Sequence, residues 1–138
     1  MPAFGQNGTA TRLRESTLVM VPQTIAGFQM RNAISARLGQ VATPRYQLEV
    51  LLNEERSPAA ITEGGDTARF DLNGTADWVL SEMRNGAQIG SGQVRSFTSY
   101  SATGSTVATQ TAEDAARERL VDALADLIVA DLVLTVSA

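Results

Sequence analysis

With 138 residues, the chain has the usual size of one domain, and its 43% apolar and 19% charged residues are typical of a globular protein. It contains no cysteine and no histidine, which excludes disulfides, thiolate nucleophiles, histidine-based triads and the common zinc sites. The formal charge of −4 argues against nucleic-acid binding, and no run of about 18 apolar residues predicts a transmembrane helix.

The start of the chain has neither the charged region nor the apolar region of a signal peptide. We expect residues 1–15 to form a flexible arm and residues 16–138 to form a single domain. These features fit a cytosolic protein and equally the mature part of an exported one, and composition does not choose between the two.

Two apolar patterns follow the arm. Leu18 to Val21 is a short apolar run that ends at Pro22 and predicts a buried strand. Thr24 to Leu38 predicts a helix, because apolar residues recur on one side and Gly39 follows as a C-terminal stop. The predicted buried side of this helix comprises Ile25, Phe28, Ala33, Ile34 and Leu38.

The next two patterns predict strands with one apolar and one polar face. Residues 45–54 alternate, and so do residues 68–80. The second alternation continues unbroken through Asn73-Gly74, so we predict one long strand and not a hairpin turn at that dipeptide. If Ile61 pairs with Ala68, its side chain is out of phase with the first alternation. A bulge or loop near Ser57-Pro58 is therefore expected.

Asn85-Gly86 predicts the turn after the long strand. A two-residue loop would mix the faces, whereas a three-residue loop over residues 84–86, with Gly86 left-handed, keeps them apart. The resulting register places Trp78 opposite Gly92, Leu80 opposite Gly90, Ala76 opposite Val94 and Phe70 opposite Tyr100. Gly90-Ser91-Gly92 also resembles part of a phosphate-binding loop, but no helix follows it, so close packing under the large side chains explains the glycines better.

The last part of the chain predicts a linker and a long helix. Residues 101–110 have small side chains and no apolar anchors, and Thr111 is the expected N-cap of a helix over residues 112–134. The predicted apolar stripe comprises Leu120, Val121, Leu124, Leu127, Ile128 and Leu132. We therefore predict an α+β fold, a two-layer sandwich in which two helices pack on one face of a mostly antiparallel four-stranded sheet, in the order β-α-β-β-β-α.

Few residues of the chain are candidates for catalysis or for metal binding. Glu54, Glu55, Glu63 and Asp66 surround one loop and could hold calcium or act as paired carboxylates. Their spacing matches no calcium-binding loop, and solvated loop charges are commoner. No pairing of a nucleophile with a base emerges, so we expect no enzymatic activity, no metal and no cofactor.

The polar face of the predicted sheet carries the remaining candidates. Arg69 and Arg95 belong to strands that pair directly, with Arg95 opposite Thr75, and Phe97 is expected to be exposed beside Arg95. An ordinary solvated sheet face is the simpler interpretation. The alternative is a surface for an anionic ligand or for a partner protein.

Several segments carry a family resemblance. Residues 93–97 read Gln-Val-Arg-Ser-Phe, residues 100–109 read Tyr-Ser-Ala-Thr-Gly-Ser-Thr-Val-Ala-Thr, and residues 112–120 read Ala-Glu-Asp-Ala-Ala-Arg-Glu-Arg-Leu. Together with Ala125-Asp126, they resemble the LptE family of lipopolysaccharide-assembly lipoproteins, also called rare lipoprotein B, in its alphaproteobacterial form. Residues 2–5, Pro-Ala-Phe-Gly, resemble the close of the lipid-attachment segment of that family.

The resemblance implies a non-catalytic lipoprotein on the periplasmic side of the outer membrane of a Gram-negative bacterium. Its membrane anchor would be an acylated cysteine a few residues before Met1. The implied partners are an LptD-type β-barrel, which the protein plugs and helps to assemble, and lipopolysaccharide, which the barrel inserts into the outer leaflet.

The resemblance supplies no ligand-binding residue. Better-studied relatives bind lipopolysaccharide through basic loop residues, and residues 57–66 and 101–110 of this chain contain none. Arg69 and Arg95 therefore remain the candidate lipopolysaccharide-binding residues. The alternative function is a free-standing α+β domain that binds a small apolar ligand between helices and sheet.

Overall fold

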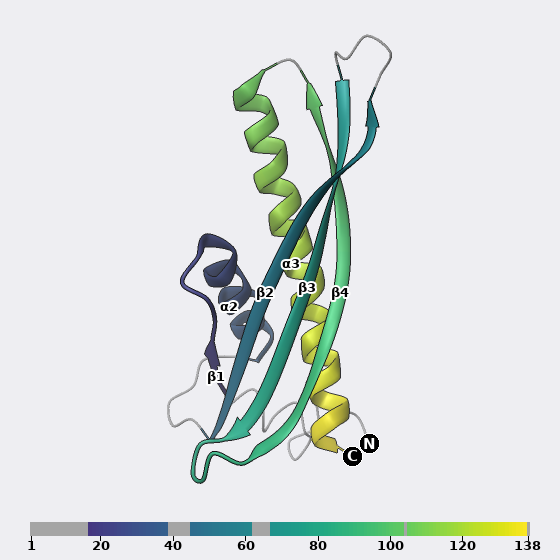
Figure 1. Cartoon of the computed structure of the whole chain (residues 1–138). Coiled ribbons are helices and arrows are strands. Elements are labelled where there is room, and N and C mark those ends of the chain that lie inside the picture. The colour runs from purple at the N-terminus through teal and green to yellow at the C-terminus, as the bar shows by residue number, and fades with distance from the viewer. Residues whose placement is uncertain (1–16, 39–44, 62–66, 104, 138) are drawn as a thin grey trace.

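The computed structural model describes residues 17–38, 45–61, 67–103 and 105–137, which form a long, narrow two-layer body (Figure 1). The predicted arm at residues 1–15 lies outside the described residues. The elements, in chain order, are β1 (Thr17–Met20), α2 (Ile25–Leu38), β2 (Tyr46–Ile61), β3 (Thr67–Glu82), β4 (Gln88–Thr103) and α3 (Thr106–Ser137).

The predicted fold class is confirmed. The four strands form one sheet in the order β1-β2-β3-β4, and both helices lie on the same face of it (Figure 1). The sheet is mixed, because β1 pairs with β2 in parallel while the other two pairs are antiparallel. The parallel pair follows from the connection between its strands, since α2 carries the chain back to the starting end of the sheet.

The predicted register between β3 and β4 is also confirmed, with Trp78 opposite Gly92 and Leu80 opposite Gly90. The Trp78 ring lies so close to Gly92 that a Cβ atom there would be 2.8 Å from the indole nitrogen. The same nitrogen donates a hydrogen bond to Asp131 of α3, 3.3 Å away. The glycines of β4 thus make room for a side chain that joins the sheet to the long helix.

The turn itself differs from the prediction. The backbone N–H of Glu82 donates to the carbonyl of Ala87, and the N–H of Gly86 donates to the carbonyl of Glu82, each at 2.8 Å. The loop therefore spans residues 83–86 and not 84–86. A bulge at Ile89 then restores the register that the apolar pattern requires. Gly86 is left-handed as predicted, with a φ of 72°.

The phase reset in β2 is confirmed as a bulge. The pairing of β2 with β3 shifts between Pro58 and Ala60, and Ile61 then pairs with Ala68 as expected. The strand continues to Ile61, well beyond the alternation at residues 45–54 that predicted it.

Two parts of the helix prediction are wrong. In α2, Ile25 and Phe28 are 75% and 45% exposed, and Gly27 and Met30 are buried in their place. Gly27 packs against the carbonyl of Pro22, which turns the side of the helix that carries Ile25 and Phe28 toward solvent.

In α3, the N-cap is Ser105 and not Thr111. Ser105 Oγ accepts a hydrogen bond from the backbone N–H of Ala108 at 3.1 Å. Residues 106–110 are therefore helix and residues 101–103 belong to β4, where the sequence predicted a linker. The early turns of α3 extend past the core, so they carry no apolar periodicity. Leu127, assigned to the apolar stripe, is 41% exposed.

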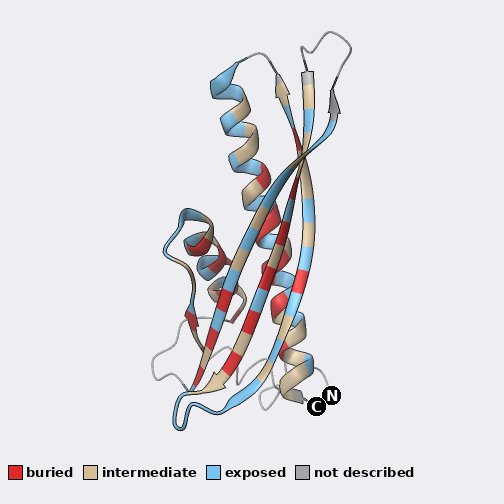
Figure 2. Cartoon of the chain, viewed as in Figure 1, coloured by how far each residue is buried: buried red, intermediate tan, exposed pale blue. Residues whose placement is uncertain are grey.

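The core lies where α2 and α3 cover the middle and lower part of the sheet as drawn in Figure 2. Its fully buried large side chains are Trp78, Met30, Ile34, Leu38, Leu48, Leu72, Leu80, Leu120, Leu124, Ile128 and Leu132. The upper part of the body is mostly exposed or half-buried (Figure 2). Within the described ranges, no helix combines the length and apolar character needed to cross a membrane.

Replacing Gly92 by alanine tests the packing of Trp78. The added methyl group would force the indole away from β4 and from Asp131, so we expect Gly92→Ala to lower the free energy of unfolding by about 1–3 kcal/mol in urea titrations. The exposed neighbour Ser91 is the control, because Ser91→Ala should change stability by less than about 0.5 kcal/mol. Equal stability of the two variants would contradict this account.

Candidate functional site

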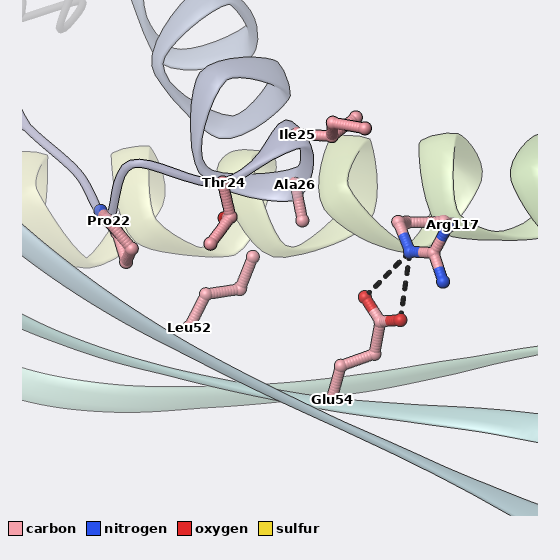
Figure 3. A pocket seen from close by; sticks show the side chains of 7 residues that line it. All are labelled: Pro22, Thr24, Ile25, Ala26, Leu52, Glu54 and Arg117. Atoms are coloured by element: carbon pink, nitrogen blue, oxygen red, sulfur yellow. Dashed lines mark hydrogen bonds and ion pairs between the residues drawn. The ribbon is translucent and has the colours of Figure 1, made fainter.

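An open cleft of about 390 Å³ lies between the start of α2, the middle of β2 and the first half of α3. Figure 3 shows its lining, which is mostly apolar, with the hydroxyl of Thr24 and an ion pair between Glu54 and Arg117 as its polar groups. The lining residues are Pro22, Thr24, Ile25, Ala26, Leu52, Glu54 and Arg117. Under the alternative function, in which the chain binds a small apolar ligand between helices and sheet, the ligand would lie in this cleft.

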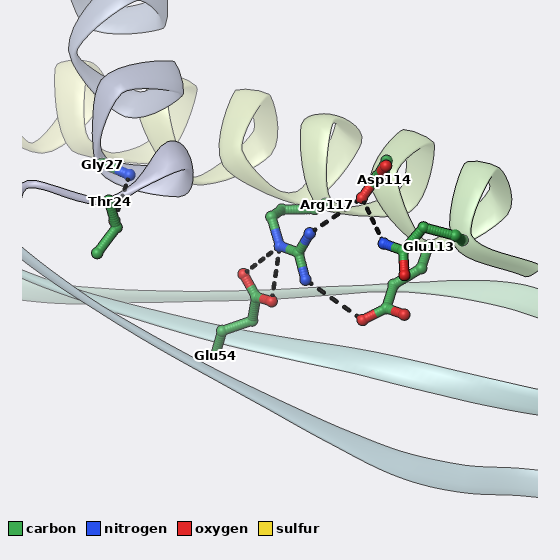
Figure 4. A network of polar contacts seen from close by, with 7 residues as sticks. Thr24, Gly27, Glu54, Glu113, Asp114 and Arg117 are labelled. Carbon is green, nitrogen blue, oxygen red and sulfur yellow. Dashed lines mark hydrogen bonds and ion pairs between the residues drawn. The ribbon is translucent and has the colours of Figure 1, made fainter.

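Arg117 is the centre of the polar network at this cleft (Figure 4). Its Nε atom donates to both carboxylate oxygens of Glu54, at 2.9 and 3.1 Å. Its terminal nitrogens donate to Glu113 and Asp114, each at 3.3 Å. The two carboxylates on α3 stand one turn before Arg117, so the helix itself positions them.

The network leaves no free positive charge for an anionic ligand. Burial lowers the pKa of Arg117, but the hydrogen bond and charge of Glu54 and the charges of Glu113 and Asp114 outweigh it, so the pKa lies above the ordinary value. Three carboxylates surround one guanidinium, so the cluster carries excess negative charge. Its role is to join β2 to α3.

The sequence did not predict this network, although it contains one signal for it. Glu54 continues the parity of Leu48, Val50 and Leu52, which places it on the helix-covered face. A carboxylate on that face requires a partner. The partner is 63 residues away, so no local pattern identifies it.

The four carboxylates proposed around one loop do not form a site in the described part of the chain. Glu54 faces α3, whereas the next residue, Glu55, is exposed and points to the opposite face of the sheet. Glu63 and Asp66 lie outside the described residues. Within residues 17–38, 45–61, 67–103 and 105–137, no three carboxylates are placed so that they could hold a metal ion together.

A second arginine also lies on the helix side of β2. Arg56 is exposed and places its guanidinium 4.8 Å from the centre of the Phe70 ring. Phe70 in turn stacks on Tyr100, with 5.7 Å between ring centres. The arginine thus covers the Phe70 ring on the helix side of the sheet.

The uncovered face of the sheet holds the two arginines proposed from the sequence. Arg95 is opposite Thr75, and Phe97 is 68% exposed two residues further along, both as expected. Two hydrogen bonds, of 3.0 and 3.2 Å, join Arg95 to Gln93, whose amide donates to Asp77 at 2.8 Å. The Arg95 side chain is therefore held along its own strand.

Arg69 lies on the same face but not beside Arg95. It pairs with Ser101 and is six residues along β3 from Thr75, a separation of about 20 Å in an extended strand. Both arginines are exposed. The two cations therefore offer two separate contacts along one face and not one shared anion site.

The comparisons with known proteins agree with this architecture. A family model described as LptE, Lipopolysaccharide-assembly, matches residues 15–132. No curated protein matches the chain.

Several solved structures share the fold. A Caulobacter crescentus protein described as a lipoprotein aligns over 97% of this chain and 99% of its own, with a TM-score of 0.80 and 22% identity. Rare lipoprotein B from Shewanella oneidensis aligns over 88% and 95%, with a TM-score of 0.65 and 12% identity. Lipoprotein B from Nitrosomonas europaea aligns over 90% and 85%, with a TM-score of 0.66 and 15% identity.

Removing the charge of Glu54 tests the network. We expect Glu54→Gln to lower the free energy of unfolding by about 1 kcal/mol, because the half-buried guanidinium loses its strongest partner. The loss should shrink in roughly 1 M salt, which screens the remaining charges. Glu55→Gln is the matched control on the opposite face and should leave stability unchanged. An equal effect of both substitutions would contradict a specific role for Glu54.

Proposed function

The chain belongs to the LptE lipopolysaccharide-assembly family, and from that membership we propose that it is a non-catalytic subunit of the lipopolysaccharide translocon. In this role it plugs an LptD-type outer-membrane barrel, assists the assembly of that barrel and binds lipopolysaccharide for insertion into the outer leaflet. A lipid anchor would hold it on the periplasmic side of the outer membrane. The match of the family model over residues 15–132 carries the proposal.

The shape and polarity of the molecule support a position inside a barrel. Each of β2, β3 and β4 has 16 residues, which corresponds to about 50 Å of extended chain. The helices cover one face only, and the other face is lined mainly by polar side chains such as Asn53, Thr75 and Gln93. The lumen of a large outer-membrane barrel is polar as well, so most of this face can lie against it, while the exposed Leu51 and Phe97 would need apolar contacts there.

Lipopolysaccharide carries phosphate groups, which arginine binds through paired hydrogen bonds. Arg69 and Arg95 are exposed on the uncovered face, and neither forms an ion pair with a carboxylate of the described residues. We therefore assign them as the lipopolysaccharide contacts. Their separation means that each would meet a different anionic group of the ligand.

Reversing both charges tests this assignment. We expect Arg69→Glu combined with Arg95→Glu to weaken lipopolysaccharide binding roughly tenfold, with little change in unfolding temperature, since both side chains are exposed. Binding is measured by titration into fluorescent lipopolysaccharide. The control reverses the exposed Arg31 and Arg84, which gives the same change in net charge elsewhere. Unchanged affinity in the first double variant rules out both residues, and equal loss in both variants indicates an effect of net charge alone.

Co-purification tests the partner. The protein is expressed from its native gene with a tag at its carboxyl end and is extracted from outer membranes in mild detergent. We expect a large β-barrel protein to co-purify in a stoichiometric amount. Recovery of the tagged protein alone would refute the role as a plug and would direct attention to the cleft beside Arg117 as a small-ligand site.

A further inference from the structure

Among the described residues, the backbone of two strands is left without a pairing strand along part of its length, and only one of these two edges carries features that prevent pairing with another chain. β1 covers residues 46–49 of β2 and leaves the rest of that edge open. The open part of β2 carries Glu54, Glu55 and Arg56 in succession, followed by Pro58 and a bulge. Charges, proline and bulges are the features that prevent an edge strand from pairing with another chain.

β4 forms the other edge of the sheet and largely lacks these features. Its 16 residues include no proline and one charged side chain, Arg95. Two local features limit its free edge. The bulge at Ile89 interrupts it at one end. At the other end, Arg119 of α3 donates to the backbone carbonyl of Ser99 at 3.1 Å.

The free edge therefore spans residues 91–97. The backbone groups of a residue in an antiparallel strand point to one side, and successive residues alternate. Because the Ser99 carbonyl points away from β3, the odd-numbered residues of β4 direct their N–H and C=O groups outward. The outward-facing residues in the free stretch are Ser91, Gln93, Arg95 and Phe97.

The flank of α3 next to this edge is apolar. Arg119 contacts Thr98 and Ser99, which identifies the side of the helix that adjoins β4. Helical spacing places Ala123, Leu127, Ala130 and Leu134 on that same side. Leu127 and Leu134 are 41% and 71% exposed. In Figure 1 the lower half of α3 runs along β4, on which it packs.

We propose that two copies of this chain associate through these two surfaces. The β4 strands would pair in antiparallel orientation about a two-fold axis at Val94 and join the two sheets into one of eight strands. The same axis would bring the apolar flanks of the two α3 helices together on the covered face. The surface comprising residues 91–97 of β4 and the α3 flank is called the β4 edge surface below.

The bulge at Ile89 and the contact of Arg119 with Ser99 mark the two ends of the free stretch, and these ends determine which residues pair in the dimer. An axis at Val94 places Gln93 opposite Arg95 of the other copy and Ser91 opposite its Phe97. This arrangement uses the whole free stretch between the bulge and Ser99. An axis at Arg95 would place two guanidinium groups opposite each other, which is unfavourable. An axis closer to Ser99 would extend the pairing over that residue, so the second copy would have to displace Arg119 from the Ser99 carbonyl.

A second copy fits better than an unrelated strand. A single foreign strand would satisfy the backbone of β4 and leave Leu127 and Leu134 exposed. In a dimer with two-fold symmetry, the second copy presents its own β4 edge and its own apolar α3 flank at the same spacing as the first copy. Each surface can therefore cover its equivalent on the other copy. This association concerns the chain itself and does not rest on the proposed barrel partner.

Sedimentation velocity of the 138-residue chain over a range of concentrations tests the proposal. We expect a monomer–dimer equilibrium whose dissociation constant rises about tenfold or more in Gln93→Pro, because proline removes an outward N–H and no bond to β3. Ser101→Pro is the matched control. It makes the same change at an outward-facing residue beyond the paired stretch and should leave the equilibrium unchanged.

Leu134→Lys provides a second variant that cannot disturb the core, since this side chain is largely exposed. It should weaken the dimer as Gln93→Pro does, while Val107→Lys, at an exposed position near the other end of α3, should not. A chain that stays monomeric, or a dimer that neither Gln93→Pro nor Leu134→Lys weakens, overturns the proposal.

Disulfide trapping tests the register. The chain has no cysteine, so each introduced thiol is unambiguous. Directly opposite residues in an antiparallel pair lie about 5.5 Å apart at Cα, within the range of a disulfide. A mixture of Gln93→Cys and Arg95→Cys proteins should cross-link faster than either protein alone, and Ser101→Cys should not cross-link. Faster cross-linking of Arg95→Cys alone would overturn the axis at Val94.

Discussion

The contact between Trp78 and β4 is the constraint on which the rest of the structure depends. The indole fits over the strand because residue 92 has no side chain, and its nitrogen reaches Asp131 across the two layers. This one residue therefore sets the register between β3 and β4 and the position of the long helix over them. The turn and the bulge at Ile89 adjust to that register and do not determine it.

The position of α3 divides the molecule into two functional faces. One face of the sheet is covered and holds the core together with the Arg117 network. The other face has no cover in the described part of the chain and carries mainly polar side chains and two separated arginines. The Arg117 network is thus structural, since three carboxylates already bind its guanidinium and leave no free positive charge at the cleft. The proposed contacts with lipopolysaccharide and with a second copy lie on the open face and the open edge.

The edges of the sheet differ for a physical reason. Beyond β1, the edge of β2 carries charges, a proline and a bulge, whereas β4 relies on a bulge at one end and Arg119 at the other. α3 covers the inner face of β4 but not its outer backbone. The chain belongs to a lipopolysaccharide-assembly family. The exposure of this edge makes the proposed association of two copies physically reasonable.

The sequence alone determined the parts of this protein that depend on strict alternation. The phase of residues 68–80, the glycines at 90 and 92 and the bulge near Pro58 predicted the sheet register because a shift of one residue would turn every side chain to the wrong face. Tertiary structure decided what has no local pattern: the side of α2 that is buried, the start of α3 at Ser105, and the pairing of Glu54 with Arg117. The physical reason is that a helix can rotate or extend past the core without breaking its own hydrogen bonds, and that an ion pair between distant residues exists only after the layers have packed.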